Sequence, residues 1–216
     1  MTDRSASPEG WRSRRHLLEG GRRRVHLIGI GGVGMSAIAV ALVGLGHTVT
    51  GSDARDSAIL AGLASLGVDT VVGHDPGLAV TADLVAVSTA IAADDPEVEA
   101  ARRGGVPVLH RFDLLAALGE VRPTLSVSGT HGKTTTSALV ALVLSAAGRD
   151  PSYIIGAAVP GLLADTPGSA RTGERDRTSC SKPTRATRPS WRRVGEPPWS
   201  PTSRPTIWIT TVRWTR

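Results

Sequence analysis

The sequence predicts an α/β protein: a doubly wound parallel sheet, then the start of a second α/β unit, then a basic tail without regular structure. Three observations support this prediction. Short apolar runs alternate with helix-like segments, as expected when each strand of a sheet is followed by a helix. Two glycine-rich loops each lie between a strand-like run and a helix-like segment. The alternation stops near Arg171, where the composition changes abruptly.

The first unit spans residues 21–120 and follows a polar, Arg-rich segment, residues 1–20, which we expect to be a mobile arm. Its strands are short apolar runs, expected at 25–28, 48–51, 70–72, 84–87 and 106–109. Its helices are expected at 35–45, 57–66, 96–103 and 112–118. Ser57 is a typical N-cap, since its hydroxyl can accept a bond from a free backbone N–H of the helix. The alternation predicts a Rossmann-like domain.

Residues 121–171 open a second unit of the same kind. Glu120–Pro123 has the composition of a linker, and Thr124–Ser128 is expected to be a strand. A glycine- and threonine-rich loop follows, and then a helix that ends near Ala147. Tyr153–Ile155 could form the next strand. Too few residues remain before the tail to bury the core of a complete domain, so we expect this unit to be incomplete.

The tail, residues 172–216, differs in composition from the rest of the chain. It holds four of the five Trp and the only Cys, and no apolar periodicity runs through it. Residues 171–216 contain 11 of the 25 Lys and Arg but only 3 of the 19 Asp and Glu. Residues 1–170 therefore hold 14 basic and 16 acidic residues. Because the net charge of +6 belongs to the tail, the sequence does not support a basic nucleic-acid-binding surface on the folded part.

Cysteine content and hydropathy bear on the compartment. One Cys, at position 180, allows no intramolecular disulfide and no cysteine-based zinc site, which fits a cytoplasmic protein. Arg22–Arg24 precede a mostly apolar run, residues 25–46, that could be a signal anchor. That run contains six Gly and leads into a strand that ends at Asp53. We therefore predict a strand, a turn and a helix here, and no membrane partner.

The first glycine-rich loop has the G-x-G-x-x-G pattern at Gly29, Gly31 and Gly34, directly after a strand. The glycines permit a tight turn, and the following helix N-terminus offers free N–H groups to a diphosphate. Alone, the pattern favours NAD binding, and it is also compatible with a turn that holds no ligand. Asp53 lies at the distance expected of a ribose-binding acid, although it could equally cap the next element.

The second loop contains Gly132-Lys133-Thr134, the core of a Walker A sequence, between a Val-containing strand and a helix. In such loops the backbone N–H groups surround phosphates, the Lys reaches the terminal oxygens and the hydroxyl binds Mg²⁺. The usual first Gly is replaced by Val127, and Gly129 lies closer in, so this is a variant loop. His131 is expected to be a loop residue rather than a catalyst.

Three segments together resemble the Mur ligases: Gly29-Ile-Gly-Gly-Val-Gly-Met-Ser36, Ser88-Thr-Ala-Ile91 and Gly129-Thr-His-Gly-Lys-Thr-Thr-Thr136. The resemblance covers about Arg24 to Gly161. In that family the first domain binds the UDP of a sugar substrate rather than NAD, the second is an ATPase and a third binds the amino acid. The motifs are most similar to those members that join L-alanine to UDP-N-acetylmuramate in peptidoglycan precursor synthesis.

The resemblance implies ATP and Mg²⁺ as cofactors, and UDP-N-acetylmuramate and L-alanine as substrates. ATP would phosphorylate the lactyl carboxylate, and the alanine amine would attack the acyl phosphate to give the amide, ADP and phosphate. The implied catalytic residues are Lys133 and Thr134, the latter also holding Mg²⁺. The implied ATP-binding residues are Gly129, Thr130, His131, Gly132, Lys133, Thr134 and Thr135. The implied UDP-sugar-binding residues are Gly31, Gly32, Gly34, Ser36, Asp53 and Ser88.

The tail can be compared with the family in a shifted reading frame. If each true codon joins the third base of one codon to the first two bases of the next, Trp208 followed by Ile209 forces Asp, and so does Trp214 followed by Thr215. The same frame permits Asp-His-Leu-Asp-His-Tyr-Gly-Glu-Val-Asp across 205–215 and Glu-Ala-Asp-Glu-Ser-Asp across 181–187. Both strings resemble segments of the Mur ligases that use L-alanine. We therefore expect a frameshift between about Asp165 and Asp176.

A frameshift would remove the acidic Mg²⁺ ligand and the alanine-binding domain, so we expect no ligase activity from the chain as written. Three alternatives stay open. A Rossmann oxidoreductase would bind NAD(H). A non-enzymatic remnant with a natural basic tail would bind nucleic acid in a salt-sensitive way. A related ligase would attach a recycled peptide instead of alanine.

Overall fold

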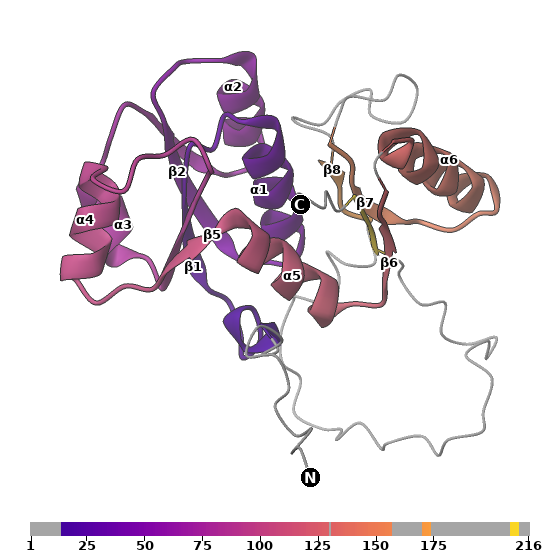
Figure 1. The fold of residues 1–216 in the computed structure, drawn as a ribbon, viewed down its shortest axis with the longest axis horizontal. Helices are drawn as coiled ribbons and strands as arrows, with labels where there is room; N and C mark the ends of the chain where they lie inside the picture. Colours follow the sequence, from indigo (N-terminus) through magenta and orange to yellow (C-terminus); the bar gives the residue numbers. More distant parts are fainter. Residues whose placement is uncertain (1–13, 130, 157–169, 174–207, 212–216) are drawn as a thin grey trace, which may run out of the picture.

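A computed structural model describes residues 14–129, 131–156 and 170–173, together with the backbone of 208–211. Two sheets organise these residues (Figure 1). The first has five strands in the order β3-β2-β1-β4-β5, and the second has four strands in the order β6-β9-β7-β8. Among the described residues, no helix has the length and apolar character that crossing a membrane requires.

The first sheet confirms the predicted doubly wound parallel arrangement. All four neighbouring strand pairs are parallel. The chain runs from β1 outward to β3, returns to β4 beside β1, and continues to β5. The strands are β1 Arg24–Ile28, β2 Thr48–Asp53, β3 Asp69–Val72, β4 Leu84–Val87 and β5 Val108–His110. These bounds lie within two residues of the predicted ones at every strand end.

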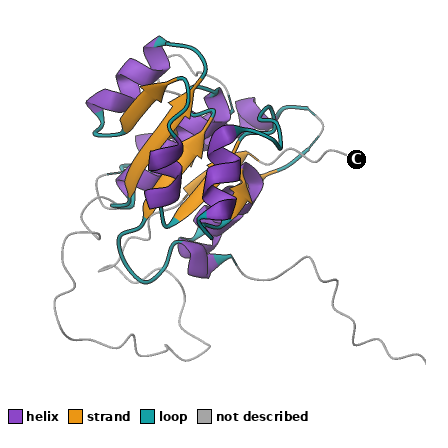
Figure 2. Cartoon of the chain, turned by 90° about the vertical axis from the view of Figure 1, so that its left-hand side faces the viewer, coloured by secondary structure: helices purple, strands orange, loops and turns teal. Residues whose placement is uncertain are grey.

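Helices cover both faces of this sheet (Figure 2). Alternate β1 side chains divide between two apolar clusters: Leu27 packs with α1, α2 and α5, whereas Ile28 packs with α3 and α4. The helices are α1 Val33–Gly44, α2 Ala58–Ser65, α3 Pro76–Thr81, α4 Pro96–Arg103 and α5 Arg111–Val121. The sequence did not predict α3, which is six residues long and begins at the N-cap Asp75. Because α5 continues to Val121, the predicted linker is shorter than expected.

The helix α1 is buried on nearly every side. Its apolar residues are small or aliphatic, and one face packs against the first sheet. Thr172 lies against the opposite face and donates a hydrogen bond from Oγ1 to the Val40 carbonyl at 3.2 Å. A Cβ on Gly44 would lie 2.1 Å from Thr172 Oγ1, so only glycine permits this close approach. The packing places the first sheet and the β7–β8 edge on either side of α1.

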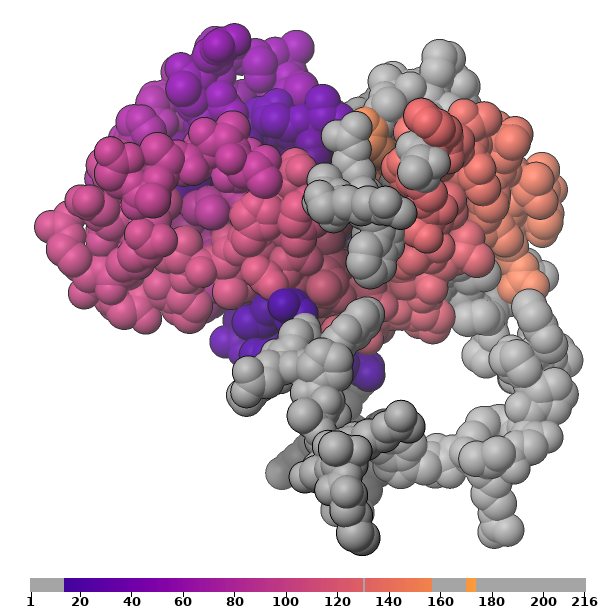
Figure 3. All heavy atoms as spheres, in the orientation of Figure 1, coloured from indigo at the N-terminus to yellow at the C-terminus, as the bar shows by residue number. Residues whose placement is uncertain are grey.

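The second unit consists of β6 Thr124–Val127, α6 Lys133–Ala146, β7 Ser152–Ile154, β8 Ala170–Arg171 and β9 Trp208–Thr211. In the space-filling view it lies beside the first domain (Figure 3). The prediction of a tail without regular structure is wrong for β9, which pairs in parallel with both β6 and β7. The β-branched residues of Trp208–Thr211 favour a strand, and two strand edges are available to it. Residues 174–207 and 212–216 lie outside the described residues.

The prediction of a mobile arm is wrong for residues 14–20. Arg15–Leu17 form a 3₁₀ turn, and Leu18 is buried in the main apolar cluster. Arg14 Nε donates to Asp113 Oδ1 at 2.6 Å, and the backbone amides of Arg14 and Arg15 donate to Glu120 Oε2. The composition of this segment is polar, so the sequence did not indicate that Leu18 is buried. Nor did it indicate that the carboxylates of Asp113 and Glu120 on α5 hold the segment in place. Residues 1–13 lie outside the described residues.

The predicted cap at Ser57 is confirmed, because its side chain accepts a hydrogen bond from the Leu60 amide at 3.3 Å. We expect Ser57→Ala to lower the free energy of unfolding by about 1 kcal/mol, the usual cost of losing an N-cap. Urea denaturation of the two proteins measures this difference. Ser65→Ala, near the other end of α2, is the control; its hydroxyl donates only to the Gly62 carbonyl, and a loss as large as that of Ser57→Ala would contradict the assignment.

Candidate functional site

The glycine turn, residues 29–34, lies where the direction of strand connection reverses. β1 and β4 are neighbours, but the chain leaves them toward opposite edges of the sheet. Ligands of open α/β sheets bind in the crevice at this point, beyond the carboxyl ends of the strands. The loop after β4 contacts the turn there: a Cβ on Gly29 would lie 3.2 Å from Ser88 Cβ. The topology therefore joins two of the three segments that carried the resemblance.

Backbone hydrogen bonds to β2 hold the beginning of the glycine turn. The amides of Gly29 and Ile30 both donate to the Ser52 carbonyl, at 2.8 and 3.0 Å. Gly29 has φ +77°, a conformation that favours glycine. These contacts explain why the chain reverses so sharply after β1 and enters α1 with its N-terminus at the sheet edge.

Asp53, at the end of β2, also holds the turn. Its Oδ2 accepts a hydrogen bond from the Gly31 amide at 2.8 Å, and its Oδ1 accepts one from the Arg55 amide at 3.1 Å. A Cβ on Gly31 would lie 2.8 Å from Asp53 Oδ2, so glycine permits this contact. Both carboxylate oxygens are therefore engaged locally. Asp53 therefore supports the turn, and its contact with a ligand stays a prediction.

Two amides at the start of α1 are available to an anion. Gly32 is the N-cap, and the amides of Met35 and Ser36 donate back to its carbonyl. The amides of Val33 and Gly34 donate to no acceptor among the residues that the structure describes. They begin a helix, where backbone N–H groups and the helix dipole favour negative charge. This is the arrangement that a diphosphate requires.

Arg111, which no sequence motif indicates, adds a positive charge beside these amides. A Cβ on Gly34 would lie 3.1 Å from Arg111 Nη1, so the guanidinium lies close to the turn. Its Nε is buried without a hydrogen-bond partner, and no carboxylate among the described residues pairs with it. Its position directly after β5, at the carboxyl edge of the sheet, was the signal that could have identified it.

The remaining predicted sugar-nucleotide residues are placed differently. Gly32 is exposed at the mouth of the turn. Ser36 is buried, and its hydroxyl donates to the Val33 carbonyl at 3.1 Å, so it would reach a ligand only by exchanging that bond. Ser88 is partly exposed and accepts a bond from the Ala90 amide at 3.3 Å. Contacts of these three residues with a ligand stay predictions.

The Walker-like loop lies between β6 and α6, as predicted. Gly129 and Gly132 have φ +151° and +77°, backbone conformations that side chains disfavour. Lys133 Nζ donates to the Gly129 carbonyl at 2.5 Å, which folds this side chain across the loop. The amides of Thr134 and Thr135 bond to no described residue, so the start of α6 can also accept an anion. His131 is exposed, and Thr130 lies outside the described residues.

Most of the described part of the chain is similar to known proteins. Residues 24–122 match the family model described as "Mur ligase family, catalytic domain". A UDP-N-acetylmuramate–L-alanine ligase from Arthrobacter sp. (strain FB24) is 50% identical over 139 residues, 64% of this chain and 30% of the relative. The corresponding ligase from Kineococcus radiotolerans is 52% identical over 153 residues, 69% of this chain and 32% of the relative. The chain thus spans about a third of the length of these relatives.

Solved structures of ligases that act on UDP-N-acetylmuramate are also similar to this chain. The UDP-N-acetylmuramate–alanine ligase of Thermotoga maritima is 33% identical with a TM-score of 0.62, over 70% of this chain and 35% of that one. A second structure, from Neisseria meningitides, is 28% identical with a TM-score of 0.66, over 88% of this chain and 52% of that one. Its protein is named UDP-N-acetylmuramate:L-alanyl-gamma-D-glutamyl-meso-diaminopimelate ligase.

Proposed function

Because residues 24–122 of this chain belong to the Mur ligase family, we propose that the glycine turn binds the diphosphate of UDP-N-acetylmuramate. The observation that carries this proposal is the pair of amides at Val33 and Gly34, which bond to no described residue, with the Arg111 guanidinium beside them. Two N–H donors and a cation can neutralise a diphosphate without any contact to its base.

We propose further that the complete protein joins L-alanine to UDP-N-acetylmuramate at the expense of ATP, in peptidoglycan precursor synthesis. The residues present fit the phosphates of ATP, since glycines with positive φ precede α6 and the amides of Thr134 and Thr135 bond to no described residue. When bound, ATP with Mg²⁺ supplies the phosphoryl group that activates the lactyl carboxylate. Lys133 would hold the phosphate charge, after its amine leaves the Gly129 carbonyl, and the Thr134 hydroxyl would hold Mg²⁺.

Isothermal titration of the purified chain with UDP-N-acetylmuramate, UDP and NAD⁺ tests the first proposal. We expect the first two ligands to bind and NAD⁺ not to bind. All three contain a diphosphate, so this expectation rests on the similarity to ligases that use UDP-N-acetylmuramate. Binding of NAD⁺ without binding of either uridine nucleotide would show that the domain is a dinucleotide site instead.

The peptide-attaching ligase is a second candidate, which the likeness to the Neisseria meningitides structure favours. Both candidates share the sugar nucleotide and differ in the acceptor. We propose, as the explanation of the tail, that the reading frame shifts between about Asp165 and Asp176. Resequencing codons 160–220 tests this: a gained or lost base restores the family segments. ADP release by the restored product with L-alanine, or with the tripeptide, would then separate the candidates.

A further inference from the structure

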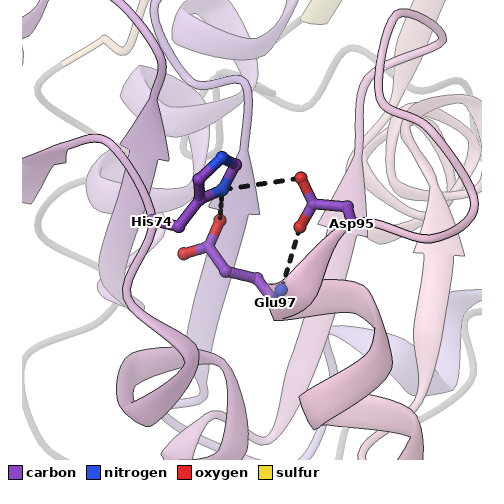
Figure 4. A group of neighbouring side chains, drawn as sticks. All are labelled: His74, Asp95 and Glu97. Atoms are coloured by element: carbon purple, nitrogen blue, oxygen red, sulfur yellow. Dashed lines mark hydrogen bonds and ion pairs between the residues drawn. The ribbon is translucent and has the colours of Figure 1, made fainter.

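A second polar cluster lies away from the glycine turn, between the loop after β3 and the start of α4 (Figure 4). His74 comes from the turn between β3 and α3, Asp95 is the N-cap of α4, and Glu97 lies in its first turn. His74 Nδ1 is 3.5 Å from Asp95 Oδ2 and 3.5 Å from Glu97 Oε2. Both carboxylates are therefore directed at the same nitrogen atom.

The distances in this cluster suit a bound metal ion better than direct hydrogen bonds. Hydrogen bonds of this kind span about 2.7–3.2 Å, so 3.5 Å is long for either contact. Ligand atoms about 2.0–2.2 Å from a tetrahedral zinc ion lie about 3.3–3.6 Å from one another. The three ligand atoms all lie within 4.8 Å of one another, close enough for one ion to contact all of them.

The two buried carboxylates of the cluster, Asp95 and Glu97, also favour a bound cation. Asp95 is 8% exposed and Glu97 is 0% exposed. In the part of the chain that the structure describes, no Lys or Arg pairs with either carboxylate, and their ionic partners are His26 and His74. Glu97 accepts hydrogen bonds from Ser52 Oγ and from the Asp75 amide, which favour its ionised form. Buried carboxylates that stay ionised need a compensating charge.

Neighbouring groups already orient the ligand atoms. Ser52 Oγ donates to Glu97 Oε2 at 2.5 Å, and the Asp75 amide donates to Glu97 Oε1 at 2.9 Å. Asp95 Oδ1 accepts from the Glu97 amide at 2.9 Å, which leaves Oδ2 facing His74. Such outer hydrogen bonds fix ligand geometry in metal sites. His74, with 46% of its side chain exposed, gives an ion access from solvent.

We propose that His74 Nδ1, Asp95 Oδ2 and Glu97 Oε2 bind a zinc ion, with a water molecule at the fourth position. The imidazole ligand favours zinc over Mg²⁺ and Ca²⁺, which prefer oxygen ligands alone. The site is distinct from both phosphate-binding loops. It is nevertheless linked to the glycine turn, because the Ser52 carbonyl accepts the amides of Gly29 and Ile30. Zinc would therefore stabilise the domain that carries the turn.

Thermal unfolding of the full chain with ZnCl₂ or with EDTA tests this proposal. Every protein would carry Cys180→Ser, which removes the only thiol. We expect free Zn²⁺ at a hundredfold excess over its dissociation constant to raise Tm by on the order of 10 °C. His74→Ala should abolish the shift, and His16→Ala, which removes another exposed histidine, should keep it. Circular dichroism in EDTA verifies that both variants fold.

Two results would overturn the proposal. The first is a Tm that Zn²⁺ does not change, or changes equally in His74→Ala. The second is a Tm that Zn²⁺ does not change in either protein, but that rises in the wild type when the pH is lowered from 8 to 6. In His74→Ala the same pH change would leave the Tm unchanged. That second result would assign a proton on His74, rather than a metal ion, as the compensating charge.

Discussion

Replacing Glu97 with alanine is expected to lower the free energy of unfolding by about 3–5 kcal/mol in EDTA. The carboxylate is fully buried and accepts hydrogen bonds from Ser52 and from the Asp75 amide, besides pairing with His26 Nε2 at 3.2 Å. Its removal would leave a cavity, and His26, Ser52 and the Asp75 amide would each lose their acceptor. An unsatisfied buried polar group costs about 1–3 kcal/mol, and three lose their partner here.

Glu99→Ala is the matched control, since Glu99 lies two residues away on α4 but is exposed. We expect it to change stability by less than about 0.5 kcal/mol. Urea denaturation in EDTA measures both variants. Equal losses from the two substitutions, or a loss below about 1 kcal/mol for Glu97→Ala, would contradict the role of the buried network.

The effect of Glu97→Ala should depend on pH in a defined direction. The pKa of Glu97 is lowered from 4.5 to about 2 in the folded protein, so the folded state favours the ionised form. The resulting stabilisation is complete above the unfolded pKa of about 4.5 and is lost as the pH falls toward 2. The difference in stability between wild type and Glu97→Ala should therefore shrink on acidification, and a difference that stays constant from pH 7 to 3 would contradict this account.

Arg111→Ala is expected to weaken UDP-N-acetylmuramate binding by about 10- to 100-fold, the loss of one or two charge-assisted hydrogen bonds. The guanidinium lies beside Gly34 with its buried Nε unpaired and with no carboxylate partner among the described residues. Its guanidinium also lies 4.9 Å from the centre of the Phe112 ring, a contact worth about 0.5–1 kcal/mol at exposed sites, so we expect a stability loss of no more than about 1 kcal/mol. Arg111→Lys should recover only part of the affinity, since an ammonium cannot donate two parallel bonds.

Titration calorimetry of the variants measures this effect. Arg103→Ala removes an exposed arginine from α4 and serves as the control for a change in net charge. It should bind as the wild type does. If both alanine variants lost affinity equally, the effect would come from long-range attraction, and Arg111 would not contact the diphosphate.

The order of elements was predictable because each strand and most helices carry their own local signals. The strands are short apolar runs, Ser57 caps α2, and the glycines of both loops mark sharp turns after strands. The short helix α3 lacked the length that makes a periodic pattern visible. Leu18 packs in the core against residues that are distant in sequence. Because its own segment is polar, no local pattern indicated that it is buried.

The position of the glycine turn could be predicted from the sequence, but the charged side chains that surround it could not. Glycine spacing located the turn, but the partners of Asp53 and the approach of Arg111 depend on how distant strands align. The same holds for Glu97, whose partners come from β1, β2 and the loop after β3. In sequence it is one of two glutamates on a polar helix, and only the packing of α4 on the sheet buries it.

The most direct test of the proposed sugar-nucleotide site is amide NMR of the chain during titration with UDP-N-acetylmuramate. We expect the largest chemical-shift changes on the amides of Val33 and Gly34, which would form new hydrogen bonds to the diphosphate. The amides of Thr134 and Thr135 should change little until ATP is added. Changes confined to the start of α6, or none at saturating ligand, would contradict the assignment of the glycine turn.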